Sequence, residues 1–449
     1  MDALWKKHAG FFEQAAGAVA ETRPDLVCFT VNSGSRFVSS RMATELRRLL
    51  PDTPIIFGGA DCFRSEYGKR HMENAAVDAL CHGEGDLALP ALAAALGREG
   101  RIPWDQPGFM VRTPSGNRDN GDPARVTKLD ELAPVSAAGI DLNRYTLPNR
   151  MTLSISRGCI NRCAFCSEGP NQGSFRSHSA AYIEQELENI LPVLSRAGKP
   201  HINFNDSLIN GSMAILSELC DRILARGWDF TWGGMAYVRE ELTPEFINKM
   251  RRAGCVEICW GIESGSERVL QLMRKRFTAK LLERVVKDTA DAGIAQYGNL
   301  IVGFPGEGPR EFAESLYFLV QNVDRLTSVG LPLCMIRLNS PLAQKPDLFG
   351  LADTQPDLWS TKDGRNTLKI RLLRRKILEG VLQAKMFDQG RVASLQAAQH
   401  EELADPELLR EHSEIFREFI AVTRERLREQ EAAAGRRPAP EREKELQTV

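Results

Sequence analysis

Three cysteines near the middle of the chain have the spacing of an iron–sulfur ligand set. Cys159, Cys163 and Cys166 stand in the run Ser-Arg-Gly-Cys-Ile-Asn-Arg-Cys-Ala-Phe-Cys, a C-x3-C-x2-C pattern. Clusters of four irons in ordinary electron-transfer proteins are held by four cysteine thiolates. Three thiolates leave one iron open, and an open iron can bind the amino and carboxylate groups of S-adenosylmethionine. The pattern therefore predicts a 4Fe-4S cluster with one open iron. An electron from such a cluster can break the adjacent carbon–sulfur bond of a bound S-adenosylmethionine and release a 5'-deoxyadenosyl radical.

Two other uses of these cysteines are less favoured by the sequence. Structural zinc usually takes four nitrogen or sulfur ligands, often from two C-x2-C pairs, and the chain has no second pair. Disulfides belong to oxidising compartments, and the first residues lack the pattern of a secretory signal. We therefore expect a cytoplasmic protein with reduced cysteines. The remaining seven are predicted to be small core hydrophobes: Cys28, Cys62, Cys81, Cys220, Cys255, Cys259 and Cys334.

Length and charge limit the classes of protein to which the chain can belong. It has 449 residues, of which 43% are hydrophobic, enough for two or three domains with real cores. Its 58 basic and 59 acidic side chains give a formal net charge of -1, so it lacks the basic field that drives nucleic-acid binding. Its apolar runs fall short of the roughly 20 residues that span a membrane. We expect a soluble protein without a nucleic-acid partner or a membrane span.

The first hundred residues alternate strand-like and helical patterns, which favours a parallel sheet covered by helices. Strands are predicted at residues 26–31, 54–57 and 77–81. In a doubly wound sheet of this kind, ligands bind at the carboxyl ends of the strands. Those ends are rich in small residues here, which would let a large flat ligand approach the backbone.

A second series of strand–helix repeats carries the cysteines. Residues 101–150 are rich in Pro, Gly, Asn and Asp and predict a linker with one hairpin. Six strand-like runs then predict a partial, open (β/α)6 barrel over residues 151–337: 151–156, 201–205, 230–234, 256–261, 294–302 and 328–336. The cysteine loop follows the first strand, at the barrel end where chemistry is normally sited. Residues 338–431 predict a loop and two helices, over 368–387 and 401–431, and residues 432–449 predict a disordered tail.

Together with the segments that follow it, the cysteine motif resembles the radical S-adenosylmethionine superfamily. The resemblance covers about 150 residues, a span close to one domain, and implies that Cys159, Cys163 and Cys166 hold the cluster. It also implies a series of contacts to S-adenosylmethionine, by Phe165, Asn205, Asp206, Arg239, Glu263, Ser264, Ile301, Gly303 and Pro305. The last three lie where the superfamily approaches the adenine, although a simple Pro-Gly turn explains Pro305 equally well.

Several of these residues also have a simpler interpretation. Phe165 would contact the adenine face, or only pack the loop. Asn205 and Asp206 would hold the methionine amino group, or cap a helix. Glu263 would accept the ribose hydroxyls, or cap the following helix, and Arg239 would bind the methionine carboxylate, or face solvent.

Over residues 20–95, the N-terminal domain resembles the cobalamin-binding domain of one branch of the superfamily. The resemblance implies that the corrin is surrounded by Ser33, Gly58, Gly59, Gly83 and Glu84. The usual domain begins with further strands, so we expect domain 1–100 to be truncated at its N-terminus. None of the seven histidines stands in the cobalt-binding pattern D-x-H-x-x-G. The nearest candidate is the histidine that precedes Gly83, for which an ordinary hydrogen-bonded role is the simpler interpretation.

The resemblance implies a radical enzyme that abstracts hydrogen from an unactivated carbon, after which methylcobalamin delivers a methyl group. One alternative is a radical rearrangement, cyclisation or oxidation without cobalamin, and another is a non-catalytic partner protein. The implied partners are an electron donor such as flavodoxin or ferredoxin and a small-molecule, lipid or peptide substrate. Residues 337–366 and the C-terminal helices are expected to close the barrel mouth and set specificity.

Overall fold

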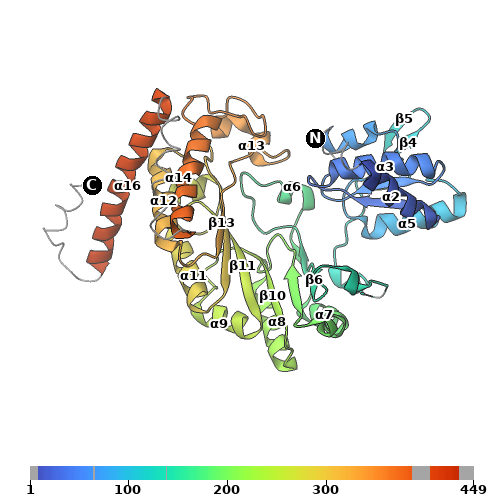
Figure 1. Cartoon of the computed structure of the whole chain (residues 1–449), viewed down its shortest axis with the longest axis horizontal. Coiled ribbons are helices and arrows are strands. Elements are labelled where there is room, and N and C mark those ends of the chain that lie inside the picture. The colour runs from blue at the N-terminus through green and yellow to red at the C-terminus, as the bar shows by residue number, and fades with distance from the viewer. Residues whose placement is uncertain (1–8, 64–65, 138, 387–404, 434–449) are drawn as a thin grey trace. The chain divides into compact units, whose positions relative to one another are not determined.

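The structure is a computed structural model that describes residues 9–63, 66–137, 139–386 and 405–433 (Figure 1). The chain divides into two compact units, Met1–Leu132 and Ala133–Val449. Each unit is built from a sheet and helices, which confirms the predicted α/β class. The predicted tail lies outside the described residues from residue 434 onward, and residues 432 and 433 end the last helix.

Unit 1 contains one five-stranded sheet in the order β1-β2-β3-β4-β5. The first three strands pair in parallel and confirm the predicted ones: Val27–Thr30, Ile55–Gly58 and Ala79–Cys81. Ile55, Ile56 and Phe57 are all buried, as expected for a parallel strand that is covered on both faces. The α-helices of this unit are α2 (Ala9–Glu21), α3 (Arg36–Leu49), α4 (Glu66–Lys69) and α5 (Gly85–Glu99).

Part of the predicted linker belongs to this sheet. β4 (Phe109–Thr113) pairs antiparallel with β3, and β5 (Gly116–Asp119) pairs with β4 as the predicted hairpin. The apolar residues Phe109, Met110 and Val111 are buried, because β4 extends the hydrophobic sheet. The prediction of a linker therefore missed that its hairpin extends the sheet of unit 1.

Unit 2 contains six parallel strands in the order β13-β12-β11-β10-β9-β6. Each overlaps one of the six predicted runs, and the last strand is shorter than the predicted run over 328–336: Arg150–Leu153, His201–Phe204, Thr231–Ala236, Cys255–Glu263, Ala295–Leu300 and Ser328–Gly330. One side of the sheet is lined by α7 (Ala180–Leu194), α8 (Met213–Arg226), α9 (Pro244–Arg252), α11 (Ala279–Asp291) and α12 (Pro309–Asn322) (Figure 1). The strand–helix repeats are confirmed, while the curvature of a partial barrel stays a prediction.

The other side of this sheet carries exposed side chains. Met235, Cys259 and Tyr297 are register partners on β10, β11 and β12. Met235 is 43% exposed, Tyr297 is 37% exposed, and Cys259 is half-buried. The neighbouring residues Trp232 and Trp260 point into the helix-covered core, because successive strand residues face opposite sides.

The prediction that all seven remaining cysteines are core residues was wrong for two of them. Cys259 lies on the exposed face of its strand, and Cys28 on β1 is exposed. In both strands the apolar character of the run concealed which face each residue occupies.

The predicted C-terminal helices are present as α14 (Leu368–Met386) and α16 (Pro406–Ala433). A fully buried arginine joins both helices to the segment after β12. Arg374 of α14 donates hydrogen bonds to the carboxylate of Glu307 at 3.0 Å and to that of Glu411 on α16 at 2.6 Å. Burial raises the pKa of Glu307 to about 7, although Arg374 opposes this shift.

The shorter elements connect these strands and helices. The α-helices are α6 (Glu168–Gln172), α10 (Glu267–Leu272) and α13 (Pro341–Gln344), and the 3-10 helices are Arg70–Glu73, Leu129–Glu131, Leu142–Arg144, Ser195–Ala197 and Pro346–Phe349. Among the described helices, none combines the length and the apolar character that crossing a bilayer requires.

Replacing the buried arginine should loosen the C-terminal helices. Arg374→Met leaves the carboxylates of Glu307 and Glu411 buried without their shared cation, which should cost about 3–5 kcal/mol of unfolding free energy. The matched control is Arg375→Met, because Arg375 is the next residue on α14 and pairs with Glu379 at a partly exposed position. Urea unfolding measures both variants, and equal losses would contradict a special role for Arg374.

Candidate functional site

The cysteine loop is closed by a short antiparallel pair, β7 (Ser156–Arg157) and β8 (Arg176–Ser177). The loop begins at Gly158, whose φ is +76°. A Cβ atom at Gly158 would lie 2.8 Å from the carbonyl oxygen of Ser174, so only glycine fits there without strain. This turn directs the chain into the three-cysteine segment.

The middle of the loop is anchored by a residue without reactive chemistry. Ala164 is fully buried; its N–H donates to the carbonyl of Met273, and its own carbonyl accepts from the N–H of Leu342, both at 3.0 Å. Phe165 packs against the same hydrophobic cluster. Because Ala164 lies between the second and third cysteines, these contacts fix the positions of both.

The three cysteines form one electrostatic group. Burial raises the pKa of Cys166 to about 11, and both Cys159 and Cys163 add to the rise. The backbone N–H groups of Asn161 and Glu168 point at Cys159 Sγ and Cys166 Sγ, each at 3.4 Å. Bound iron would hold the cysteines as thiolates, and N–H donors to sulfur are typical of cluster sites.

Within the described part of the chain, no three His, Cys, Asp or Glu side chains are placed to share a single metal ion. A cluster makes a different demand, because each thiolate binds a different iron. The donor set of the loop, three grouped thiols with amide donors at two of them, fits that demand.

Asp206 holds the strand that leads into the loop. It is buried, and its carboxylate accepts hydrogen bonds from the N–H of Ile155 at 3.1 Å and from the hydroxyl and N–H of Ser156. These three donors occupy the carboxylate that we predicted to contact the methionine amino group. The neighbouring Asn205 is exposed, and only its backbone has a bond in this region, to Leu153.

The guanidinium of Arg239 is likewise hydrogen-bonded to other groups of the protein. Its guanidinium donates to Glu241 at 2.6 Å and to the carbonyls of Asn210 at 2.9 Å and Gly211 at 3.3 Å. A methionine carboxylate could be bound by this fork only if some of these bonds were released.

Glu263 ends β11 in an unusual backbone conformation. Its φ is +63°, a value that is rare outside glycine and that recurs at functional sites. The residue is 8% exposed, and its Oε1 accepts a hydrogen bond from Lys275 Nζ at 3.0 Å. The carbonyl of Glu263 accepts from the N–H of Ile301 at 2.9 Å, which brings the end of β12 beside it.

Lys275 was missed by the sequence analysis. Its side chain is 5% exposed, and its Nζ lies 5.4–5.8 Å from the ring centroids of Phe165, Tyr237 and Phe277. It therefore connects the cysteine loop to Glu263. In the sequence it stands in the basic run Arg-Lys-Arg at residues 274–276, where nothing distinguishes a buried lysine from a solvated one.

Ser264 supports the turn after β11. It is fully buried, and its hydroxyl lies 2.9 Å from that of Ser315, which also accepts the N–H of Gly265. These contacts hold the turn against α12.

The space beside Gly303, where we predicted the adenine, is occupied by a side chain of the protein. Gly303 has a φ of +77°, and a Cβ there would lie 2.3 Å from Cγ of Arg371. The side chain of Arg371 therefore fills the space that we assigned to the adenine. Pro305 is buried and belongs to a turn in which the N–H of Glu307 bonds the carbonyl of Phe304.

The residues predicted to surround a corrin lie in unit 1, at or after the carboxyl ends of β1, β2 and β3: Ser33, Gly58, Gly59, Gly83 and Glu84. Gly59 has a φ of +96°, and a Cβ there would lie 2.8 Å from the carbonyl oxygen of Val31. His82 is buried, with Nδ1 3.1 Å from the carbonyl oxygen of Cys62. The hydrogen-bonded interpretation of this histidine is confirmed.

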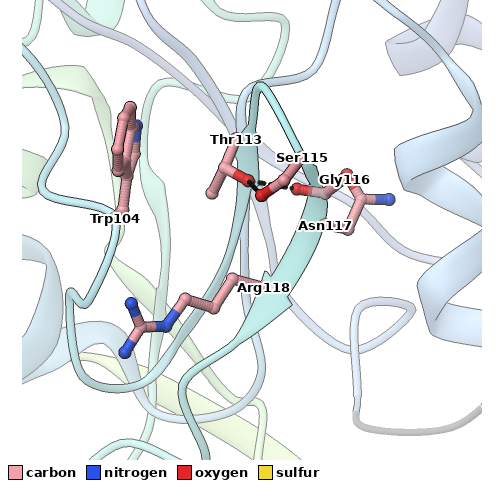
Figure 2. Close-up of a pocket in the computed structure, with 6 residues that line it drawn as sticks. All are labelled: Trp104, Thr113, Ser115, Gly116, Asn117 and Arg118. Atoms are coloured by element: carbon pink, nitrogen blue, oxygen red, sulfur yellow. Dashed lines mark hydrogen bonds between the residues drawn. The ribbon is translucent and has the colours of Figure 1, made fainter.

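A hollow of about 290 Å³ lies on the hairpin of unit 1. Figure 2 shows its lining residues: Trp104, Thr113, Ser115, Gly116, Asn117 and Arg118. The hydroxyl of Thr113 lies 3.1 Å from that of Ser115 and bonds the carbonyl of Gly116 at 2.7 Å. None of the predicted site residues lines it.

Comparison with known families identifies the part of the chain that carries the cysteines. Residues 153–319 match the model of the radical SAM superfamily. By this match, residues 153–319 form a radical SAM domain. Radical SAM domains use a 4Fe-4S cluster and S-adenosylmethionine, so the predicted resemblance is confirmed for this part of the chain, together with the two cofactors that it implies.

Curated relatives of this chain include a methyltransferase and a cyclase. An uncharacterized methyltransferase from Pyrococcus horikoshii is 25% identical over 68% of this chain and 66% of that protein. The anaerobic magnesium-protoporphyrin IX monomethyl ester cyclase of Rubrivivax gelatinosus is 23% identical over 68% of this chain and 55% of that protein. The match thus spans somewhat more than half to about two thirds of these relatives.

Two solved structures share the fold. TsrM from Kitasatospora setae, a radical S-adenosylmethionine methyltransferase with cobalamin and a 4Fe-4S cluster bound, has a TM-score of 0.64 and 21% identity over 80% of this chain and 73% of that one. OxsB, a cobalamin-dependent radical enzyme with aqua-cobalamin bound, has a TM-score of 0.69 and 17% identity over 94% of this chain and 74% of that one. At these identities the likeness concerns the fold.

Titration of Asp206 should make the unfolding free energy of this protein depend on pH. Burial raises the pKa of Asp206 from 3.8 to about 6, although its three donors oppose the rise. Since the folded pKa exceeds the unfolded one, the contribution is fully present below about pH 4 and is lost as the pH rises through 6. The loss should be on the order of 3 kcal/mol.

Asp206→Asn removes this titration. The unfolding free energy of the wild type minus that of the variant should therefore fall between pH 4 and pH 7. Denaturant unfolding at several pH values measures it, with Asp229→Asn as the control, because the Asp229 side chain is 85% exposed. A difference that stays constant with pH would contradict the prediction.

Proposed function

We propose that this chain is a radical SAM enzyme that binds a 4Fe-4S cluster through Cys159, Cys163 and Cys166 and cleaves S-adenosylmethionine reductively. The observation that carries the proposal is the placement of the cysteine loop. The loop follows β6 of a six-stranded parallel sheet and lies against the segment Met273–Lys275, which is bonded to Glu263. The three cysteines and the predicted ribose carboxylate thus belong to one site.

Each predicted residue then has a defined task. The cluster supplies the electron that breaks the carbon–sulfur bond of S-adenosylmethionine, and an external donor such as flavodoxin or ferredoxin replaces that electron. Glu263 has one oxygen fixed by Lys275 and a second that can accept ribose hydroxyls. Asn205 offers an exposed amide to the methionine group, whereas Asp206 and Arg239 would act mainly by holding the backbone.

We further propose that the radical leads to cobalamin-dependent methylation of an unactivated carbon. The support is the methyltransferase relative and the two structural neighbours that have cobalamin bound. In unit 1, Ser33 is exposed and the glycine-rich ends of three parallel strands lie at one edge of a sheet, a usual position for ligands in such folds. We propose a small-molecule substrate that lies on the exposed face of Met235, Cys259 and Tyr297.

The second candidate is a radical cyclisation, rearrangement or oxidation without cobalamin. It is favoured by the similarity to the magnesium-protoporphyrin cyclase. A non-catalytic partner protein would have no use for three grouped cysteines with amide donors.

Anaerobic reconstitution of the full chain with iron and sulfide, followed by hydroxocobalamin and desalting, separates these functions. Methylation predicts that the absorption of both cluster and cobalamin is retained in stoichiometric amounts. Retention of the cluster alone, with release of 5'-deoxyadenosine, would favour the second candidate. A protein without a cluster would contradict both.

Cys163→Ala should abolish both the cluster absorption and the release of 5'-deoxyadenosine, because one iron loses its protein ligand. Cys220→Ala is the matched control, since Cys220 is a buried core cysteine of α8 outside the motif. The near-ultraviolet circular dichroism of both variants should stay close to that of the wild type. Retained cleavage in the Cys163 variant would contradict the ligand assignment.

Ser33→Trp tests the proposed cobalamin edge of unit 1. A bulky side chain at this exposed turn should lower cobalamin retention at least tenfold without lowering cluster content. Ser115→Trp, at the exposed tip of the hairpin of the same unit, is the control. Equal retention in the two variants would place the corrin elsewhere.

A further inference from the structure

A buried positive charge lies beside the cysteine loop. The N–H of Ala164, the residue after Cys163, donates to the carbonyl of Met273, two residues before Lys275. The Nζ of Lys275 is 5.5 Å from the ring centroid of Phe165, the residue before Cys166. The lysine therefore meets the loop between its second and third cysteines.

The turn that carries this lysine is fixed on both sides. Arg274 has a φ of +61°, which is unusual for a residue with a side chain. The N–H of Lys275 bonds the carbonyl of Leu270, and the N–H of Arg276 bonds the hydroxyl of Tyr237. These two hydrogen bonds fix the backbone on both sides of the Lys275 side chain.

Burying an ammonium group is costly unless opposite charge or suitable dipoles surround it. Here the surroundings are the Glu263 carboxylate, whose Oε1 lies at 3.0 Å, the carbonyl of Gly261, which accepts from Nζ at 3.4 Å, and three aromatic rings. The rings attract the cation through their negative faces. The titratable groups that act on Lys275 are Glu263, Cys163 and Tyr237, and of these the Glu263 carboxylate bonds Nζ directly.

Three thiolates contribute three negative charges, which the iron–sulfide core balances only in part, and reduction of the cluster adds one more. The net charge around a cluster is one of the factors that set its reduction potential. A fixed cation beside the second and third cysteines stabilises the reduced form, and a fixed anion has the opposite effect.

We propose that Lys275 is a positioning residue that raises the reduction potential of the cluster and holds Oε1 of Glu263, so that the other carboxylate oxygen is presented to S-adenosylmethionine. The inference rests on the proposed function, because it requires the cluster at the three cysteines. It assigns a role to a residue outside the cysteine motif and outside the predicted contacts to S-adenosylmethionine.

The test is a redox titration of the reconstituted full chain, followed by electron paramagnetic resonance of the reduced cluster. Lys275→Met removes the cation and should shift the potential to more negative values. Glu263→Gln removes the anion and should shift it to more positive values, and the double variant should return close to the wild type. A general loosening of the site would instead move both single variants in the same direction.

Two controls make the result specific. Lys275→Arg keeps the charge and should keep the potential near that of the wild type. Lys287→Met removes a lysine of α11 whose side chain is 56% exposed, and it should leave the potential unchanged. Iron and sulfide contents are measured for every variant.

The outcomes separate the inference from the proposed function. If the wild type assembles no 4Fe-4S cluster, the proposed function fails and the inference fails with it. If the wild type assembles one and the two single variants shift in the same direction, or neither exceeds the Lys287 control, only the inference is overturned. Should Lys275→Met hold no cluster, a positive shift in Glu263→Gln with an unshifted Lys275→Arg supports the inference, and any other result overturns it.

Discussion

The ion pair between Lys275 and Glu263 joins the parts of the site that the chain supplies from distant positions. The cysteine loop between β7 and α6 has no regular secondary structure, so its shape depends on what it packs against. The segment that carries Lys275 bonds the backbone of this loop, and the lysine itself bonds the end of β11. Because the pair is buried, the loss of either partner would leave the other charge uncompensated.

A second set of buried charges comes from the C-terminal helix α14. Arg371 and Arg374 of α14 are both fully buried. The first covers Gly303 and stacks on Trp359 at 3.9 Å from the ring centroid, and the second holds Glu307 against α16. The turn after β12 is thereby fixed by the C-terminal helices, which links the predicted contacts to S-adenosylmethionine to a part of the chain outside the matched superfamily region.

The sequence predicted well what depends on local pattern. The cysteine spacing identified the superfamily and its cofactors, and the strands of both sheets followed from apolar runs separated by helical patterns. The hairpin within residues 101–150 was predicted, but its pairing with β3 was not, because the linker-like composition of this segment does not show that the hairpin extends the sheet of unit 1. Cys28 and Cys259 were misassigned because an apolar run does not show which face of the sheet is covered.

Several site residues have roles that could not be predicted, because these roles depend on contacts with residues far away in the sequence. Asp206 and Arg239 stand at the ends of strands, as ligand-binding residues do, yet their side chains are bonded mainly to neighbouring backbone and to Glu241. Gly303 has the positive φ of a glycine that permits close approach, but the group that approaches is the side chain of Arg371, from a helix more than sixty residues later in the sequence. No sequence pattern indicates that Lys275 is buried, because its burial depends on three aromatic rings that are not adjacent to it in the sequence.

The most direct test of the central claim is whether S-adenosylmethionine binds the cluster itself. The reconstituted protein is reduced under anaerobic conditions, and its electron paramagnetic resonance spectrum is recorded before and after S-adenosylmethionine is added. The account predicts a 4Fe-4S signal whose g-values change on addition, because the amino and carboxylate groups bind the iron that lacks a cysteine. A cluster signal that stays unchanged at saturating S-adenosylmethionine would contradict the account.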